Sequence, residues 1–332
     1  KYYEFDLHNS GDIKFSYSED KINFDSLRLV HNGGKLDIGG QLSFTGNEDL
    51  TLKLSNFKLK DLSSKLLGLS SERSFDGELN LDFVMTGTAA NPVINLNYSI
   101  DSIKAQNIYL GSLESEIQYS DKLLNVDLNF LEAKNNQSRS SLGLKGTFPI
   151  DLAFYSEERL IKNKTVDMTL VADNFDLRFA TGLIPGIRNL NGLMNGNINF
   201  NGTYDDLKNG GELTIGNSSL VLAANNLTYL LDAKINFENN KILISDLHLK
   251  NEPDIKDGGT MTARGEIVHQ NFKIESISLN ASGALKLLDK RSRAADPSLF
   301  GDITVRTRNE IVFTSSEARS YLKADLILAR GA

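Results

Sequence analysis

The chain repeats itself in segments that have the pattern of β-strands with one apolar face. The clearest pair of copies is 77–88, GELNLDFVMTGT, and 192–203, GLMNGNINFNGT. In both copies apolar residues fall on alternate positions and the segment closes on Gly-Thr. Two further pairs of copies are 21–29 with 241–249, and 54–59 with 172–177. Repetition on this scale predicts a stack of similar units, each roughly 110–120 residues long, rather than one globule.

This pattern predicts one elongated body instead of separate domains. Its approximate internal repeats are 1–70, 71–187, 188–290 and a partial copy at 291–332. The first residues, KYYEFDL, and the stretch 322–328, LKADLIL, already alternate like strands. We therefore expect the sequence to be an excerpt of a longer protein, with any membrane anchor or export signal outside it.

Period-two alternation dominates the chain and predicts about 25–30 strands, each with one apolar and one wet face. Turn residues such as Asn32-Gly33-Gly34 separate the runs at short intervals, which favours antiparallel meander connections. Three short helices are expected at 61–67, 176–182 and 284–289. Each follows a strand that carries an asparagine: Asn56, Asn174 and Asn280.

Composition excludes several classes of protein. The net charge of −7 and a pI near 5.3 argue against a nucleic-acid partner, which would need a basic surface. The short basic cluster at 286–293 is interpreted as a solvated loop. The chain has no cysteine, which removes thiol catalysis, zinc-thiolate sites and disulfides. No run of about 18 apolar residues occurs, so no membrane-spanning helix is predicted.

No catalytic signature stands out. The four histidines, His8, His31, His248 and His269, are scattered, and His248 is expected to face water. Neighbouring carboxylates such as Asp205-Asp206 and Glu157-Glu158 are interpreted as solvated loop charges. No P-loop, dinucleotide fingerprint, metal-binding helix or nucleophile elbow is present. The absence of Trp argues against a polysaccharide-processing role. We expect no enzyme, no cofactor and no metal.

A sheet with one apolar face must cover that face. It can close on itself, pair with a second sheet, or bury something that is not protein. We predict a mainly β fold: a long, curved, repeat-built antiparallel sheet that forms an open U-shaped groove, with a few short helices. The residues expected to line the groove are Phe15, Phe24, Leu27, Leu29, Leu36, Ile38, Leu42, Phe44, Leu50, Leu52, Leu54, Leu79, Leu81, Phe83, Met85, Ile94, Leu96, Tyr98, Ile117, Tyr119, Val126, Leu128, Phe130, Leu142, Leu144, Met168, Leu170, Ile198, Phe200, Leu213, Ile215, Ile235, Phe237, Leu247, Leu249, Ile303, Val305, Leu326 and Leu328.

A family resemblance rests on the order of these motifs. Residues 56–100 run Asn-Phe-x-Leu, short helix, Gly-x-Leu-x-Leu-x-Phe-x-Met-x-Gly-Thr, turn, Asn-Pro-x-Ile, strand, and 174–215 copy them. This order resembles the repeated segments of the TamB branch of the AsmA-like proteins. The stretch 299–306, followed by 322–328, is similar to the part of these proteins that precedes their final C-terminal segment. The resemblance covers most of the chain. The second copy departs from it, because Asp205-Asp206-Leu207 replaces Ala90-Asn91-Pro92.

The resemblance implies a bridge-like lipid-transfer protein with an apolar groove of the kind called a β-taco. It implies a periplasmic location, an inner-membrane anchor outside this sequence, phospholipid as the cargo, and an outer-membrane barrel of the assembly-factor class as partner. The alternating apolar residues suit such a role without the resemblance as well. Each acyl methylene buried against them contributes about 0.8 kcal/mol to the free energy of binding. Two hypotheses remain: a lipid-conducting scaffold without catalysis, and a structural β-rich envelope or adhesin module with a closed, protein-filled core.

Overall fold

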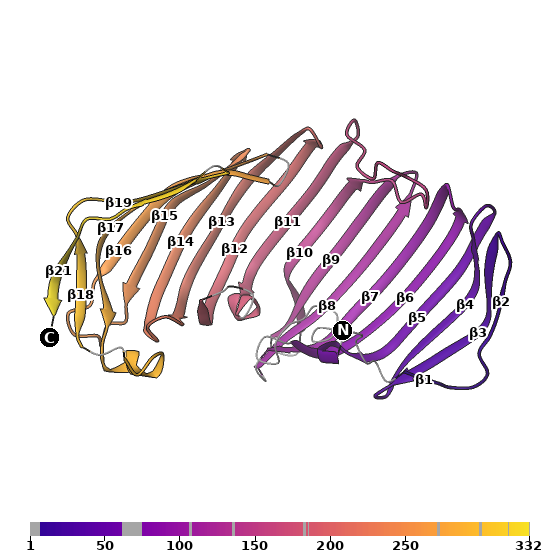
Figure 1. The fold of residues 1–332 in the computed structure, drawn as a ribbon, viewed down its shortest axis with the longest axis horizontal. Helices are drawn as coiled ribbons and strands as arrows, with labels where there is room; N and C mark the ends of the chain where they lie inside the picture. Colours follow the sequence, from indigo (N-terminus) through magenta and orange to yellow (C-terminus); the bar gives the residue numbers. More distant parts are fainter. Residues whose placement is uncertain are drawn as a thin grey trace. The chain divides into compact units, whose positions relative to one another are not determined.

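The structure is a computed structural model. It describes residues 7–61, 75–105, 108–134, 137–181, 184, 186–270, 273–298, 301–317 and 319–331. In these residues the chain is mainly β, with 21 strands in one antiparallel sheet that stays open and almost no helix (Figure 1). The predicted mainly β, antiparallel fold is confirmed. The expected 25–30 strands exceed the 21 found because single strands run to 17 residues, as in β12 and β13.

The chain divides into two compact units. Unit 1 comprises Lys1–Leu170 with Gly202–Asp205, and unit 2 comprises Val171–Asn201 with Asp206–Ala332. Two strands contribute residues to both units: β11 (Thr165–Asp176) and β12 (Ile187–Thr203).

Unit 1 is an antiparallel meander. Its strands are β1 (His8–Asn9), β2 (Lys14–Tyr17), β3 (Lys21–His31), β4 (Gly34–Ser43), β5 (Asn47–Lys58), β6 (Phe75–Thr88), β7 (Asn91–Ala105), β8 (Ile108–Ser120), β9 (Leu123–Lys134) and β10 (Gln137–Pro149). From β3 to β10 each strand pairs with the next one in the sequence. At the start of the unit β3 pairs with two short strands, β2 along its first half and β1 near its end.

Unit 2 is also an antiparallel meander, and near its end one strand pairs with two others. Its strands are β13 (Asp206–Leu222), β14 (Thr228–Asn239), β15 (Lys241–Asn251), β16 (Thr260–Gln270), β17 (Lys273–Leu288), β18 (Ile303–Thr307), β19 (Ile311–Ser316), β20 (Ser320–Lys323) and β21 (Leu326–Gly331). Strand β17 pairs with β19 along its first part and with β18 along its last part. Strand β20 then pairs with β19, and β21 pairs with β18.

The repeated sequence segments adopt the same local geometry. Asn56 and Asn174 both have left-handed backbones, with φ of 57° and 53°. The N–H group of Asn56 donates to Oδ1 of Asn80 at 2.9 Å, and that of Asn174 donates to Oδ1 of Asn195 at 2.7 Å. Asparagine tolerates this conformation better than most residues. In the first copy it marks a β-bulge, where the register shifts between Leu54 and Phe57.

A second bulge recurs in the other pair of copies. In β3 the register shifts between Phe24 and Leu27, and in β15 it shifts between Ile244 and Leu247. Each bulge reverses the phase of the alternation, because one extra residue moves the following side chains to the opposite face. Phe24 and Leu27 therefore project from the same face although they are three positions apart, and the same holds for Ile244 and Leu247.

The short helices differ from their predictions. The segment at 176–182 contains η2 (Leu177–Ala180), a single 3-10 turn in which the Asp176 carboxylate accepts from the N–H group of Arg178 at 2.9 Å. The helix predicted at 284–289 is wrong, because residues 284–288 continue β17, which pairs there with β18. Sheet pairing overrides the local helical pattern there. The predicted helix at 61–67 lies outside the described residues after Asp61.

The interpretation of 286–293 as a solvated loop is also wrong. Lys286 lies in β17, and only 2% of its surface is exposed. Its ammonium group is 2.6 Å from Oδ1 of Asp302 and donates to the carbonyl of Lys256 at 2.7 Å. Residues Lys290–Ala294 form the 3-10 helix η3, which Asp289 caps with its carboxylate. A lysine this deeply buried is retained because its charge is paired.

Candidate functional site

One face of unit 1 carries rows of apolar side chains that cross its strands. Direct partners in an antiparallel pair project from the same face, so the register identifies the rows. The first row is Leu29, Leu36, Leu54, Leu81, Tyr98, Ser115, Leu128 and Leu144; the second is Leu27, Ile38, Leu52, Phe83, Leu96, Ile117, Val126 and Gly146; the third is Phe24, Gly40, Leu50, Met85, Ile94, Tyr119, Leu124 and Phe148; and the fourth is Phe57, Leu79, Ile100, Leu113, Phe130 and Leu142. We call these residues the apolar face of unit 1.

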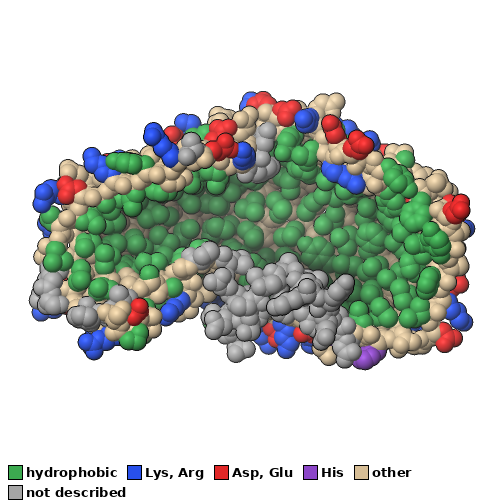
Figure 2. All heavy atoms as spheres, in the orientation of Figure 1, with side chains coloured by type: hydrophobic (Ala, Val, Ile, Leu, Met, Phe, Trp, Pro, Cys, Tyr) green, Lys and Arg blue, Asp and Glu red, His purple; other side chains and the backbone are tan. Residues whose placement is uncertain are grey.

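Unit 2 has an apolar face of the same construction. One row is Leu213, Ile235, Ile244, Gly265, Leu279, Phe313 and Leu322; the next is Ile215, Ala233, Leu247, Ala263, Ala281 and Ile311; and shorter rows are Phe237, Ile242, Ile267 and Ile277, and Leu231, Leu249 and Met261. Figure 2 shows hydrophobic side chains gathered over the visible face of the strands in each unit, with charged side chains at the margins. None of the row positions in either unit carries a charge.

The opposite face of unit 1 carries charged and polar side chains. In unit 1 a row of the opposite phase runs through Arg28, Asp37, Lys53, Asp82, Asn97, Glu116, Asp127 and Lys145. Ion pairs link its members, with Lys53 2.9 Å from Asp82 and Lys145 2.9 Å from Asp127. The Lys145 ammonium, which hydrogen-bonds Asp127, holds the pKa of that carboxyl below its usual range. The strands of unit 1 therefore carry rows of apolar side chains on one face and a row of charged and polar side chains on the other.

Most members of the rows are neither enclosed nor fully exposed. Leu52, Phe83 and Leu96, in the middle of unit 1, are all half-buried. Partial burial is what a sheet face gives when neighbouring side chains cover each other's flanks but no second layer covers their tips. The face therefore presents apolar surface that its own side chains only partly cover.

Some positions in the rows are glycines that bend the strands. Gly40 lies in the third row at φ 93°, and a Cβ built there would be 1.8 Å from the carbonyl oxygen of Asp49. Only glycine tolerates this conformation and this close approach. Glycine kinks and bulges of this kind are how sheets acquire strong local curvature.

The structure brings most predicted lining residues together in these rows, and it places the others as follows. Phe15 and Leu42 pair with Phe24 and Ile22 on the apolar face of unit 1. Phe44 lies in the turn after β4 instead of in a strand. Val305 faces Leu328 across the β18–β21 pair, with Ile303 and Leu326 on the same strands. Met168 and Leu170 lie in β11, and Ile198 and Phe200 lie in β12.

Sequence reasoning missed several row members. They are Phe57, Ile100, Leu113, Leu124 and Phe148 in unit 1, and Leu231, Ile242, Ile244, Met261, Ile267, Ile277, Leu279, Ile311, Phe313 and Leu322 in unit 2. Phe57 and Ile244 were missed because each adjoins a bulge. The signal was present, since Asn56 and the paired residues Ser245-Asp246 interrupt the alternation at the bulges.

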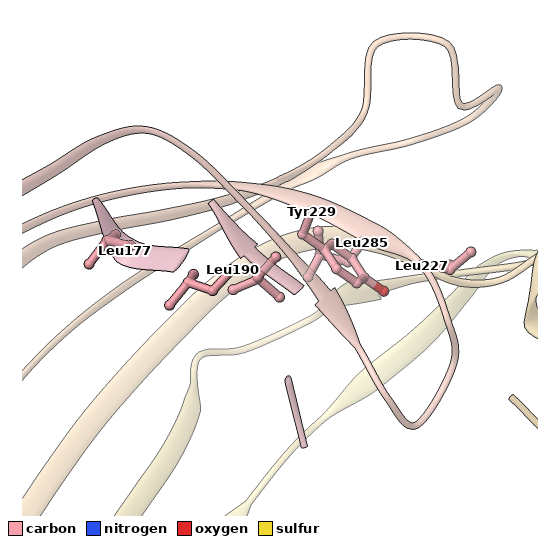
Figure 3. Close-up of a cluster of buried hydrophobic side chains, with 6 residues drawn as sticks. Leu177, Leu190, Leu227, Tyr229 and Leu285 are labelled. Carbon is pink, nitrogen blue, oxygen red and sulfur yellow. The ribbon is translucent and has the colours of Figure 1, made fainter. Parts of the chain in front are cut away.

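One end of the unit 2 face is filled by protein. The buried cluster contains Leu177 from η2, Leu190 from β12, Leu220 from β13, Leu227 from the β13–β14 turn, Tyr229 from β14 and Leu285 from β17 (Figure 3). Leu227 and Tyr229 have no exposed surface. Row members Leu231, Leu249 and Met261 pack against the cluster and are half-buried. We call this group the sealed cluster.

A buried polar network supports the sealed cluster. The hydroxyl of Tyr229 donates to the carbonyl of Lys286 at 3.0 Å and accepts from Nδ2 of Asn225 at 2.8 Å. Burial raises the pKa of the Tyr229 phenol. Asn251 bonds both backbone groups of Lys286, its Oδ1 accepting at 2.9 Å and its Nδ2 donating at 3.1 Å. These contacts fix the end of β17 beside β14 and β15.

The histidines lie apart from one another. His248 is on the polar side of β15, 2.9 Å from Asp246, and its side chain is partly exposed as expected. His31 stacks on Phe57 and lies 3.4 Å from Asp61. Nε2 of His269 lies 2.6 Å from the Asn209 amide. Within the described residues, no group of three or more His, Cys, Asp or Glu residues could hold a metal ion.

Comparison with known proteins adds no assignment. No family model, no curated protein and no solved structure matches the chain. The part of the chain that the structure describes contains no helix long and apolar enough to cross a membrane. The candidate site is therefore defined by the apolar faces alone.

Proposed function

We propose that each apolar face lines an open, U-shaped groove that binds the acyl chains of phospholipids and conducts them. The observation that carries this proposal is the set of uncharged rows, most of whose members remain half-buried. Monomeric proteins rarely leave contiguous apolar surface of this kind without a partner or ligand. The protein would act as a scaffold without catalysis.

The energetics of the rows suit transport as well as binding. A buried acyl methylene contributes about 0.8 kcal/mol, so a lining as apolar as a bilayer interior lets a chain leave the bilayer at little net cost. Movement along the lining requires that no position be much more or less favourable than its neighbours. A buried charge would raise a barrier of several kcal/mol. The row through Leu52 and Phe83 contains no charged residue.

The family resemblance supplies the setting of this proposal. The chain would belong to an inner-membrane-anchored periplasmic protein that carries phospholipid between the inner and outer membranes. An outer-membrane barrel of the assembly-factor class would be its partner, with a contribution to outer-membrane protein assembly. The anchor would lie outside residues 1–332.

A photocrosslinking experiment tests the assignment of the face. Phe83 and Val84 are neighbours in β6 whose side chains project from opposite faces, since Phe83 pairs with Leu96 and Val84 pairs with Asn95. We would place p-benzoylphenylalanine at each position in turn and irradiate the protein in the presence of labelled phospholipid. We expect strong labelling from position 83 and little from position 84.

The second hypothesis, a structural module with a closed core, is favoured by one observation, the sealed cluster of unit 2. It predicts that purified protein carries no lipid and that position 83 crosslinks only to protein. Organic extraction followed by mass spectrometry distinguishes the two. Absence of lipid from the extract, together with equal labelling from positions 83 and 84, would reject the lipid-conducting scaffold.

A further inference from the structure

The connection between β10 and β11 folds back over the strand ends of unit 1. Residues 150–164 run along the margin that carries the β4–β5, β6–β7 and β8–β9 turns, as Figure 1 shows. The N–H group of Phe154 donates to the carbonyl of Ala89 at 2.9 Å, and the hydroxyl of Tyr155 donates to the carbonyl of Phe44 at 3.2 Å. The connection therefore links hairpins that are otherwise joined only through neighbouring strands. We call it the strap.

Further tethers hold the start of the strap on β8 and β9. The N–H group of Leu152 donates to the hydroxyl of Tyr119 at 2.8 Å. The Lys122 ammonium is 2.8 Å from Oδ2 of Asp151. The hydrogen bond that this lysine donates holds the pKa of the Asp151 carboxyl below its usual range, and the Ala153 N–H group lowers it further. Nearly all of these contacts are polar, so their groups can bond to water when the strap leaves.

The strap lies over one margin of the apolar face. The third row runs along this margin, where Tyr119 is 2% exposed and Met85 is buried, as is Ala89 in the β6–β7 turn. The middle of the second row, at Phe83 and Leu96, is only half-buried. At the strap, Tyr119 and Met85 are thus shielded from water, while Phe83 and Leu96 in the middle of the face are less so.

We propose that the strap is a releasable gate that controls lateral access of acyl chains to the apolar face of unit 1. The inference rests on the proposed function and adds a route of loading. Releasing the strap exchanges its polar tethers for water at small cost, because a protein hydrogen bond is only modestly stronger than its replacement. It also exposes Tyr119 and Met85 in the third row, which an arriving acyl chain then covers in place of the strap.

Locking the strap tests the gate. The chain has no cysteine, so Ala89→Cys with Phe154→Cys supplies a unique pair for a short, reducible thiol crosslinker. The measurement is the rate at which the full chain takes up a phospholipid with a fluorescent acyl chain from vesicles of phosphatidylethanolamine and phosphatidylglycerol. We expect uptake at least tenfold slower in the crosslinked form and restored by reductant.

A matched pair of substitutions tests the same gate from the other side. Lys122→Met removes a tether, and Lys145→Met removes an ion pair of the same kind on the polar face, 2.9 Å from Asp127. Loss of one partly exposed ion pair should speed uptake about twofold to fivefold in the first variant. The second should take up lipid at the wild-type rate.

The outcomes separate the gate from the proposed function. Uptake by the crosslinked form at the wild-type rate, or equal acceleration by both lysine substitutions, would overturn the gate and leave lipid binding standing. Failure of every form to take up lipid, with no photocrosslinking from position 83, would overturn both. Slow uptake only while the crosslink is intact supports the gate.

Discussion

The middle of the unit 1 face and the sealed cluster of unit 2 are built from the same alternating pattern but have different surroundings. Phe83 has direct apolar partners on both neighbouring strands, Leu52 and Leu96, and is half-buried. Tyr229 also sits between paired strands, yet it has no exposed surface. Alternation thus defines which face is apolar, but it does not determine whether protein covers that face.

The difference lies in what the neighbouring connections do. In unit 2, η2 supplies Leu177 and the β13–β14 turn supplies Leu227, and both side chains pack over the strand ends. Asn226 in that turn also donates to the carbonyl of Arg291 in η3. In unit 1 the strap stays at the strand ends, with its tethers at Tyr119, Ala89 and Phe44. Coverage of the face is therefore decided by connections, not by strands.

The largest contrast is expected when a carboxylate enters each region. Leu227→Asp places a charge where no surface is exposed, and it should lower the free energy of unfolding by about 4 kcal/mol or more. Leu52→Asp, in the half-buried second row, should cost less than about 1 kcal/mol because water can hydrate the new carboxylate. The measurement is chemical denaturation of both variants.

Leu52→Asp is also expected to block lipid transport by the full-length protein, as is Phe83→Asp, because a charge in the lining raises a barrier to acyl chains. Folding should remain largely intact. If Leu52→Asp destabilised the protein as much as Leu227→Asp, the unit 1 face would be a sealed interior, and the comparison between the two regions would fail.

A smaller effect is expected from single hydroxyl groups. Tyr229→Phe removes a donor to the Lys286 carbonyl and an acceptor for Asn225, so it should lower the free energy of unfolding by about 1–2 kcal/mol. Tyr98→Phe, on the unit 1 face, should change it by less than about 0.5 kcal/mol. Equal effects would place Tyr98 in an enclosed environment as well.

Tyr229 should also make the stability of the protein depend on pH in alkaline solution. Burial raises the pKa of Tyr229, so the folded protein keeps the phenol protonated while the unfolded chain ionises near its ordinary value of 10.0. Stability should therefore fall as the pH rises above that value, by the linkage between proton binding and folding. Unfolding midpoints at several pH values would measure this slope. Tyr229→Phe should reduce it, and an unchanged slope would show that other groups cause it.

The sequence predicted the face of most strands because alternation is a local property. Leu81, Phe83 and Met85 could be assigned to one face from their spacing alone, and the register agrees. The assignment ran out at bulges, where a single added residue reverses the phase. Ile242 and Ile244 were left out for this reason, although they share a face with Leu247.

Contacts between distant residues carried no such local signal. The tether from Tyr155 to Phe44 joins residues 111 positions apart, and the Asn225 bond to Leu287 joins residues 62 apart. The burial of Lys286 was unpredictable for the same reason, since its partner Asp302 lies in the turn before β18. Strands were therefore predictable from sequence, whereas the connections that cover or spare the apolar face were not.

The smallest expected effect is a difference in local stability in mild acid between the surroundings of His269 in unit 2 and the strap in unit 1. Burial lowers the pKa of His269 below its ordinary value of 6.5, although Glu275 nearby raises it in part. The neutral ring accepts from the Asn209 amide. The unfolded chain binds a proton as the pH falls through 6.5, and the folded protein resists it. This contribution to stability is therefore present above that pH and is lost as the pH falls below it.

In unit 1 the Asp151 carboxyl, whose pKa the Lys122 ammonium lowers from 3.8, keeps its charge through this range. Amide exchange should therefore rise between about pH 7 and pH 5, by less than about tenfold, around Asn209 and His269 but not along the strap. These rates must first be corrected for the intrinsic effect of pH. His269→Gln should remove the rise. A lysine–carboxylate pair remains ionised in mild acid, whereas the unfolded state of a chain with a buried neutral histidine is favoured by proton binding. If the strap loosened first, Lys122 and His269 would therefore not be the groups that hold the two margins.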